Sequence, residues 1–398
     1  MNPQRVLITG ATGFVGCRLA EVLVGKGIDV TGMVRSWHKA ARLARLPIRM
    51  VHGDLLNPGS LREAMRNCDT VFHCALDSSS DGAAHRQAMV EGTTNVMAAA
   101  LAENVKKIVY LSSTAVYGFW PTATHVTEET PIPYTGSAYC DGKIDCENVA
   151  LKYHREHGLP VTILRPTMVY GPFETFWAAH LVRCLGRNWM TLVNGGAGIC
   201  NSLYIDNLIS AMIRAAEQES AVGQVFIISD AQTVTWKQMV ERHAEVVKGC
   251  RLPLPDATAE EIAAARADVE RGNNPSSLRA AFRLLRKPET RSALRTVPML
   301  ATAEKVARSV VDRMPDDVLQ LVKRAAKSAN GNKPSVENGV TAPAKAPVIP
   351  LSDHDVRLFT CNVTFSIEKA RKLLGYEPRI DFAEGIRRTA EWIKWMRL

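Results

Sequence analysis

The chain opens with a short apolar run that ends in three glycines spaced three residues apart. The run Val6–Thr9 is rich in β-branched residues, and a helical pattern begins directly after the last glycine. The glycines are Gly10, Gly13 and Gly16. A strand, a tight turn and a helix N-terminus together form a phosphate pocket, because free amides and the positive helix end hold negative charge. We therefore expect a dinucleotide to bind here.

Each glycine of this turn has its own expected role. Gly10 lets the chain turn, Gly13 lets a pyrophosphate approach the backbone, and Gly16 lets the helix pack closely on the strand. A glycine triplet alone is weak evidence, but the strand before it and the helix after it make the motif specific. The other cofactor-binding residues expected in the turn are Thr12, Phe14 and Val15.

Short apolar runs alternate with helical stretches through residue 165. This alternation predicts an α/β fold, a Rossmann-type doubly wound parallel sheet with helices on both faces and ligand at the carboxyl ends of the strands. The expected strands are Val6–Thr9, Val30–Val34, Arg49–His52, Thr70–Cys74, Lys107–Ser112 and Val161–Arg165, and the expected helices lie around 15–26, 61–67, 84–104 and 137–157.

The sequence pattern divides the chain into several expected parts. Residues 1–165 form the expected NAD(P)-binding domain. Residues 166–250 predict a smaller substrate-binding part, which includes Val225–Ser229 and a helix around Asn207–Gln218 rather than more of the sheet.

The C-terminal third differs from what precedes it. Residues 251–327 are rich in Ala, Leu and Arg and are cut by prolines, which predicts a helical insertion. Residues 328–350 are polar and Pro-rich and predict a flexible linker. Residues 351–398 predict a return to the substrate-binding part, with helices over Ser366–Leu374 and Phe382–Met396.

Composition narrows the classes of protein. The net charge is +9, but aromatic residues make up only 6% and no basic-aromatic stripe is present, so nucleic-acid binding is not expected. Nine scattered cysteines without a Cys-x-x-Cys pair indicate reduced thiols and no metal site. No signal peptide and no apolar run of about 18 residues is recognisable, so we expect a cytoplasmic protein.

A serine, a tyrosine and a lysine form the expected catalytic set. Tyr139 and Lys143 share one helix face, and an ammonium close to a phenol lowers the pKa of the phenol. Ser113 follows a strand, where it can hold a substrate oxygen while Tyr139 moves the proton. The trio suits hydride transfer by a nicotinamide cofactor. A surface Tyr/Lys pair is the plainer alternative, which the glycine turn and the serine disfavour.

These motifs resemble those of the extended short-chain dehydrogenases/reductases, the NAD(P)-dependent epimerase/dehydratase group. The resemblance covers about residues 4–240 and 355–398. The matching stretches are Thr9–Gly16, Gly53–Leu55, Val71–Ala75, Gly92–Val96, Ser112–Gly118, Tyr139–Lys143, Arg165–Pro172 and Lys369–Trp392.

The resemblance implies roles for single residues. Tyr139 is the implied acid/base, Lys143 the ribose anchor and modulator of the tyrosine pKa, and Ser113 the hydroxyl that polarises the substrate oxygen. The further implied cofactor contacts are Asp54 and Leu55 near the adenine, the Ala75 backbone on the nicotinamide side, and Pro166 beside the carboxamide. A plain turn carboxylate is the alternative for Asp54. The resemblance also implies a homodimer formed through two helices, one of which carries Tyr139.

One departure from the family concerns the cofactor. The second strand ends in Val34–Ser36, where an NAD enzyme normally has an acidic residue for the ribose hydroxyl. Arg35 suits a 2′-phosphate instead, so NADP is expected and NAD is the alternative. Arg35 is otherwise a solvated arginine in a basic stretch with Lys39 and Arg42.

Two more departures concern the substrate. Thr114–Ala115 replaces the Asp-Glu pair of the dehydratases, so elimination of water is not expected. The stretch Gly198–Ser202 lacks the arginine that epimerases use for a substrate pyrophosphate, although Arg183 or Arg187 can substitute.

Three functions follow in order of preference. The first is an NADP-preferring oxidoreductase that interconverts a secondary alcohol and a ketone of a small-molecule substrate. The second is an NAD-dependent sugar or nucleotide-sugar epimerase with the same residues. The third is a non-catalytic dinucleotide-sensing protein. For the insertion 251–327, a helical lid is preferred over an attachment to an anionic membrane surface.

Overall fold

The chain forms two compact units. The computed structural model describes residues 4–76, 82–247, 250, 252–270, 349 and 351–396. The first unit contains Met1–Ala259 and Leu351–Leu398, and the second contains Glu260–Pro350. The expected insertion (251–327) and linker (328–350) lie largely outside the described residues. Within them the structure describes residues 252–270, with β12 (Asp256–Ala257) and α8 (Ala259–Glu270), and residue 349.

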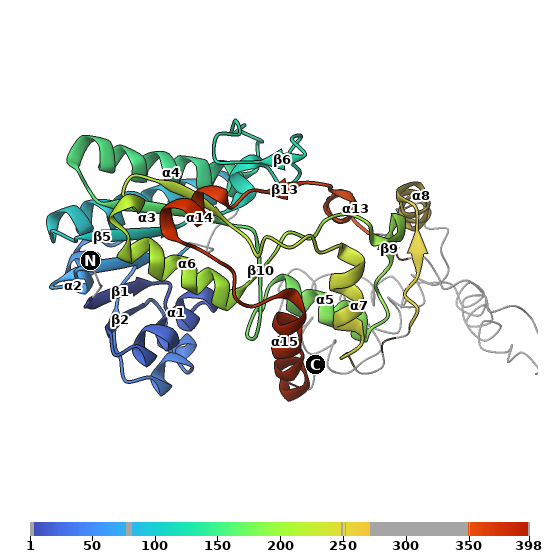
Figure 1. The fold of residues 1–398 in the computed structure, drawn as a ribbon, viewed down its shortest axis with the longest axis horizontal. Coiled ribbons are helices and arrows are strands. Elements are labelled where there is room, and N and C mark those ends of the chain that lie inside the picture. Colours follow the sequence, from blue (N-terminus) through green and yellow to red (C-terminus); the bar gives the residue numbers. More distant parts are fainter. Residues whose placement is uncertain are drawn as a thin grey trace, which may run out of the picture. The chain divides into compact units, whose positions relative to one another are not determined.

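A seven-stranded parallel sheet forms the centre of the first unit (Figure 1). Its strands are β1 (Arg5–Thr9), β2 (Asp29–Val34), β3 (Arg49–His52), β4 (Thr70–His73), β5 (Lys107–Leu111), β7 (Val161–Pro166) and β11 (Val225–Ile228). They lie in the order β3-β2-β1-β4-β5-β7-β11, so the order in which strands are added to the sheet reverses between β1 and β4. The predicted doubly wound sheet is confirmed, and all six expected strands belong to it.

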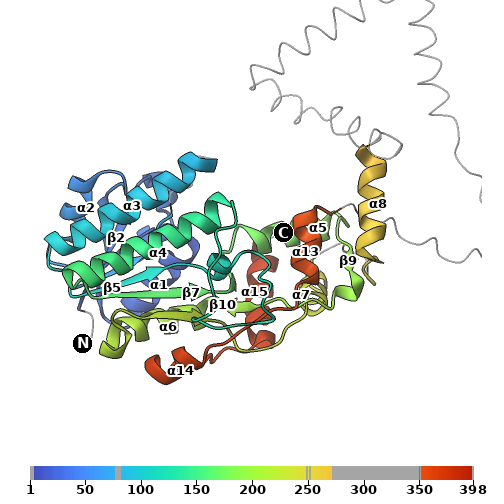
Figure 2. The same cartoon turned by 90° about the horizontal axis from the view of Figure 1, so that it is seen from above.

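Helices cover both faces of this sheet (Figure 2). They are α1 (Phe14–Gly25), α2 (Pro58–Met65), α3 (Gly82–Ala102), α4 (Ala138–His157) and α6 (Ile205–Glu217). Helix α3 packs along α4 on one face, and α1 packs against α6 on the other. Each face has its own buried apolar core. Because both faces are covered, the strands are nearly continuous apolar runs, and all six residues of β7 are buried.

One strand of the sheet corrects an expectation. Val225–Ser229, expected outside the sheet, provides its edge strand, with Phe226 opposite Leu164 of β7. Phe226 and Ile228 are fully buried. Part of the cover of this edge is α14 (Glu368–Leu374), which contacts β11 from far along the chain. Nothing in the composition of residues 166–250 indicates that a distant helix covers this strand. The sequence therefore does not show that the strand belongs to the sheet.

Short strands and further helices complete the first unit. They are β6 (His125–Val126), β8 (Met168–Tyr170), β9 (Leu192–Val193), β10 (Ser202–Tyr204), β13 (Thr364–Phe365), α5 (Trp177–Gly186), α7 (Trp236–Ala244), α13 (Asp353–Thr360) and α15 (Phe382–Met396). Strand β8 pairs with β10, and β13 pairs with β6. Helix α15 packs closely on β8 and β10, because a Cβ at Gly385 would collide with the Tyr170 hydroxyl and lie 2.9 Å from Tyr204.

A buried Asn–Asp pair fastens the returning C-terminal segment. Asn207 donates to Asp230 at 2.7 Å, and the Tyr204 amide donates to the same carboxylate at 2.8 Å. The side-chain oxygen Oδ1 of Asn207 accepts from the backbone amides of Arg379 and Ile380 at 2.9 and 3.0 Å. Burial raises the pKa of Asp230 to about 7. One amide side chain thus joins α6, the end of β11 and the segment that leads into α15.

The structure bears on two further expectations. All nine cysteines are free thiols. Within the described ranges, no helix combines the length and the apolar character needed to cross a bilayer.

Candidate active site

The glycine turn brings two backbone segments into direct contact at the point where the strand order reverses. Gly10 has a positive φ of +69°, which favours glycine. A Cβ on Gly10 would lie 2.7 Å from the Ala75 nitrogen, and a Cβ on Gly16 would collide with the Gly10 carbonyl. The turn therefore has room only for glycine at both positions, so β1, α1 and the end of β4 approach as closely as the motif predicts.

The N-terminus of α1 has the features of an anion site. The Gly13 amide donates to the Gly10 carbonyl at 2.9 Å, and Gly13 is the N-cap residue, without a side-chain cap. The first turn contains no acidic residue. The amides of Phe14 and Val15 have no partner inside the helix by geometry, and the positive helix end lies beside them. These residues fit a pyrophosphate.

Two side chains hold the end of β4 beside the turn. The Ala75 amide donates to Thr9 Oγ1 at 3.3 Å, and Thr9 Oγ1 lies 2.8 Å from His73 Nδ1. Burial lowers the pKa of His73 to about 3, so its ring is neutral. The Ala75 backbone, expected on the nicotinamide side, is thereby fixed against Gly10.

Asp54 and Leu55 lie in a turn after β3. The Leu56 amide donates to Asp54 Oδ1 at 2.9 Å, and the Asp54 amide donates to Ser60 at 3.1 Å. The Leu55 carbonyl accepts from Asn95 at 3.0 Å. The Asp54 carboxylate thus stabilises the turn, which agrees with its alternative role as a turn carboxylate. Its contact with the adenine stays a prediction.

Arg35 follows the last residue of β2 and is exposed. Its basic neighbour Arg42 has a different environment. Arg42 pairs with Glu21 of α1 at 2.7 Å, and its guanidinium lies 3.9 Å from the centre of the Phe173 ring. The two arginines of this stretch are therefore not equivalent, since Arg42 is engaged with α1.

Ser113 and Tyr139 meet at the carboxyl end of β5. Ser113 caps the 3-10 turn Thr114–Tyr117, and its Oγ accepts from the Ala115 amide at 3.1 Å. Because this lone pair is occupied, the hydroxyl proton is free to point toward another oxygen. Burial raises the pKa of Tyr139, and the nearby Ser113 hydroxyl offsets part of this effect.

The arrangement of Lys143 differs from the expected one. Its ammonium donates to the Leu111 carbonyl at 2.9 Å and lies 5.2 Å from the centre of the Tyr110 ring. Burial lowers the pKa of Lys143. In this structure the ammonium is directed at the β5 carbonyl and burial dominates the phenol, so the role of Lys143 in lowering the pKa of Tyr139 stays a prediction.

A buried ion pair underlies these groups. Arg165 of β7 binds Glu147 of α4 at 2.5 Å, and both side chains are about 95% buried, with 5% and 4% of their areas exposed. Ser112 donates to Glu147 at 2.5 Å, and Arg165 donates to the Tyr117 hydroxyl at 2.5 Å. The network fastens α4 to β5 and β7. Next to Arg165, the Pro166 carbonyl accepts from the Thr114 hydroxyl at 3.2 Å.

Several residues near Tyr139 were not singled out from the sequence. The Phe119 ring stacks on the Tyr139 ring, with centres 6.2 Å apart and planes at 9°. His354 of α13 packs edge-on against Phe119 at 5.4 Å. The sequence contains no motif for this contact, because more than 200 positions separate the two segments. Only the position of Phe119 directly after Gly118 marks it as close to the site.

The stretch Gly198–Ser202, where epimerases place an arginine for a substrate pyrophosphate, contains no basic side chain. Cys200 is fully buried, and the Asn201 amide group donates to the Val363 carbonyl at 2.8 Å. The departure noted in the sequence therefore persists in the fold.

The glycine turn lies where the strand order reverses, and a serine, a tyrosine and a lysine lie near the end of the neighbouring part of the sheet. Together these features define a class of nucleotide-dependent enzymes with a Rossmann-type sheet. Residues 6–229 match the NAD dependent epimerase/dehydratase family, and the chain belongs to this family. It is an NAD(P)-dependent enzyme of the extended short-chain type, and the family relation fits an oxidoreductase or an epimerase.

Individual relatives agree with this assignment. A 4-hydroxy-2-methyl-3-oxo-4-farnesyl-3,4-dihydroquinoline-1-oxide ketoreductase of Stigmatella aurantiaca is 29% identical over 58% of this chain and 70% of its own length. A 2-alkyl-3-oxoalkanoate reductase of Shewanella oneidensis is 30% identical over 60% of this chain and 64% of its own length. A UDP-glucose 4-epimerase of Thermotoga maritima, crystallised with UDP-glucose, shares the fold, with a TM-score of 0.64, 18% identity and 99% of both chains covered.

The buried ion pair generates a stability prediction. Replacing Glu147 by Gln leaves the Arg165 charge buried without its partner, and such losses cost about 3–5 kcal/mol. We expect a clearly lower midpoint in urea denaturation. The control is Glu156→Gln on the same helix, whose pair with Lys152 is 3.9 Å long and exposed. That change should cost less than about 1 kcal/mol. Equal midpoints for the two variants would contradict the anchoring role of Glu147.

Proposed function

We propose that the protein is an oxidoreductase that interconverts a secondary alcohol and a ketone, with Tyr139 as acid/base. The observation that carries the proposal is the placement of Ser113, which caps the turn after β5 close enough to Tyr139 to affect the pKa of the tyrosine, at the same edge of the sheet as the glycine turn. The nicotinamide of the cofactor supplies or accepts the hydride. The protein side chains bind the substrate oxygen and move its proton.

The proton chemistry follows from the environment of each group. Because burial raises the pKa of Tyr139, the phenol holds its proton at neutral pH and is an acid for a ketone oxygen. Ser113 donates to the same oxygen, since its own lone pair accepts from Ala115. Lys143 anchors the ribose in this proposal. The remaining proposed cofactor contacts are Gly10, Thr12, Gly13, Phe14, Val15, Gly16, Arg35, Asp54, Leu55, Ala75 and Pro166.

The relatives support reduction over epimerisation. Both reductases are named for ketone substrates with an alkyl or farnesyl chain. The epimerase proposal needs a contact for a sugar-nucleotide pyrophosphate, and Cys200 and Asn201 do not supply one. A small ketone with apolar substituents is therefore the substrate class that we propose.

Replacing Tyr139 by Phe should abolish reduction while leaving the fold intact. The change removes the proton donor, and general acid catalysis is worth about 100-fold to 10,000-fold in rate. The measurement is loss of NADPH absorbance with a ketone that the wild-type protein reduces. The control is Tyr153→Phe on the same helix α4, which should keep full activity. Turnover close to wild type in Tyr139→Phe would refute the proposed role.

The preference for NADP is also part of the proposal. Arg35 stands directly after β2, where it suits a 2′-phosphate, and no acidic residue occurs in Val34–Ser36. Arginine binds phosphate through paired, charge-assisted hydrogen bonds.

An Arg35→Ala variant should separate the two cofactors. Hydrogen bonds to charged groups contribute about 1.5–3 kcal/mol, so the Kd for NADPH should rise roughly tenfold to a hundredfold, while the Kd for NADH changes little. Fluorescence titration measures both constants. Arg45→Ala, an exposed arginine in the same segment, is the matched control. A wild-type protein that binds NADH more tightly than NADPH would contradict the proposal.

Assembly, compartment and domain limits are further parts of the proposal. Helices α3 and α4 pack together, and we propose that this pair mediates a homodimer. Light scattering of the purified protein tests this. Nine free thiols support a reducing compartment such as the cytoplasm. The domain limits at 165, 250, 327 and 350 stay predictions, as does the role of 251–327 as a lid rather than a membrane attachment.

A further inference from the structure

A cavity of about 470 Å³ lies beside the catalytic segment, and its walls combine aromatic rings, prolines and one cation. Its lining includes Phe119, Trp120, Pro121, Pro133 and Arg357. Among these described lining residues none is acidic, and Arg357 is the only lysine or arginine. The cavity therefore favours an apolar ligand with a negative charge.

The cavity is connected to Tyr139 through a row of ring contacts. The Phe119 ring stacks on Tyr139 at 6.2 Å and contacts the Trp120 ring at 5.9 Å. The Arg357 guanidinium lies 5.4 Å from the centre of the Trp120 ring. His354 supports both aromatic rings, at 5.4 and 5.2 Å. A ligand that reaches from Tyr139 to Arg357 thus passes along two aromatic side chains.

Arg357 is placed to bind an anion at the far end of this row. It lies on the exposed side of α13, and in the part of the chain that the structure describes no carboxylate forms an ion pair with it. The Trp120 ring holds the guanidinium by a cation–π contact, which leaves its N–H groups available in the plane. A planar guanidinium matches a carboxylate through two parallel hydrogen bonds.

We propose that this cavity binds the distal end of the substrate, and that the substrate is a ketone with an apolar chain and a carboxylate at the end remote from the carbonyl. The chain lies on Phe119 and Trp120, and the carboxylate binds Arg357. This inference rests on the proposed ketone reduction, because it places the reacting carbonyl at Tyr139. It makes Arg357 a specificity-determining residue that lies outside the proton-transfer set.

Binding to an unreactive protein tests the proposal directly. Two probes with the same carbon chain are oxododecanoate, with its ketone next to the terminal methyl group, and the methyl ester of this acid. Calorimetry with Tyr139→Phe in the presence of NADP should show about tenfold tighter binding of the acid, as expected for one charge-assisted contact. Adding Arg357→Gln should abolish this difference, and adding Arg357→Lys should retain part of it.

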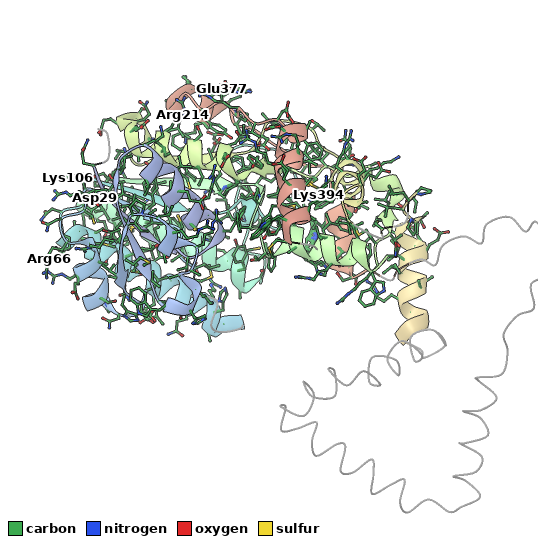
Figure 3. All side chains as sticks on the ribbon, turned by 90° about the horizontal axis from the view of Figure 1, so that it is seen from below. Asp29, Arg66, Lys106, Arg214, Glu377 and Lys394 are labelled. Atoms are coloured by element: carbon green, nitrogen blue, oxygen red, sulfur yellow. The ribbon has the colours of Figure 1, made fainter. Side chains whose placement is uncertain are left out.

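A matched charge removal is the control. Arg66 is exposed at the end of α2. In Figure 3 it is labelled among the helices beside the central sheet, far from Lys394 of α15. Adding Arg66→Gln should leave the preference for the acid unchanged. Equal affinity for acid and ester, a preference that survives Arg357→Gln, or failure of both probes to bind would each overturn the inference.

The outcomes also separate this inference from the proposed function. If the wild-type protein reduces acid and ester equally well and Tyr139→Phe reduces neither, the ketone reduction stands and the role of Arg357 fails. If Tyr139→Phe still turns over while the charge preference depends on Arg357, the cavity binds the acid but the proposed proton donor is wrong.

Discussion

The buried pair between Glu147 and Arg165 is the interaction on which the geometry of the site depends. Two opposite charges in an apolar interior are stable only when every hydrogen-bonding group around them is used. Ser112 and Tyr117 provide those partners, so strand β5, strand β7 and helix α4 meet at one point. The proposed catalytic groups lie next to this point, since Ser113 follows Ser112 and Lys143 precedes Glu147 by one helical turn. Pro166, a proposed cofactor contact, follows Arg165.

Burial has a second consequence, for the direction of proton transfer. Tyr139 is partly buried, which favours the neutral phenol, and Lys143 is buried, which disfavours the ammonium. The Leu111 carbonyl compensates part of the cost for Lys143. A neutral phenol beside a serine hydroxyl is a proton donor at neutral pH. This protonation state agrees with the proposed role of Tyr139 as the acid for a ketone oxygen.

Sequence reasoning succeeded where a local pattern determines the structure. The β-branched runs and the glycine spacing around Gly10 predict the sheet and its turn, because strand burial and backbone contact depend on residues close together in the chain. It failed at Val225–Ser229, which is covered in part by the distant α14. It also failed at Phe119 and Arg357, which line one cavity only because the C-terminal segment returns to the first unit. The sequence also could not predict the pKa of Tyr139. Helix periodicity places Lys143 on a helix face, but it does not show to which acceptor the ammonium donates.

The strand order places the region proposed to recognise the cofactor and the region proposed to recognise the substrate on opposite sides of β1 and β4. Strands β1 and β4 lie between β2, which ends before Arg35, and β5, which ends before the serine and the aromatic cavity. The glycine turn lies at this division, so the proposed hydride transfer takes place between the two recognition regions. Arg357, the proposed contact for the distal end of the substrate, belongs to the segment after the insertion and not to the sheet. Changes in that segment can therefore alter the choice of substrate without disturbing the turn that we propose binds the dinucleotide.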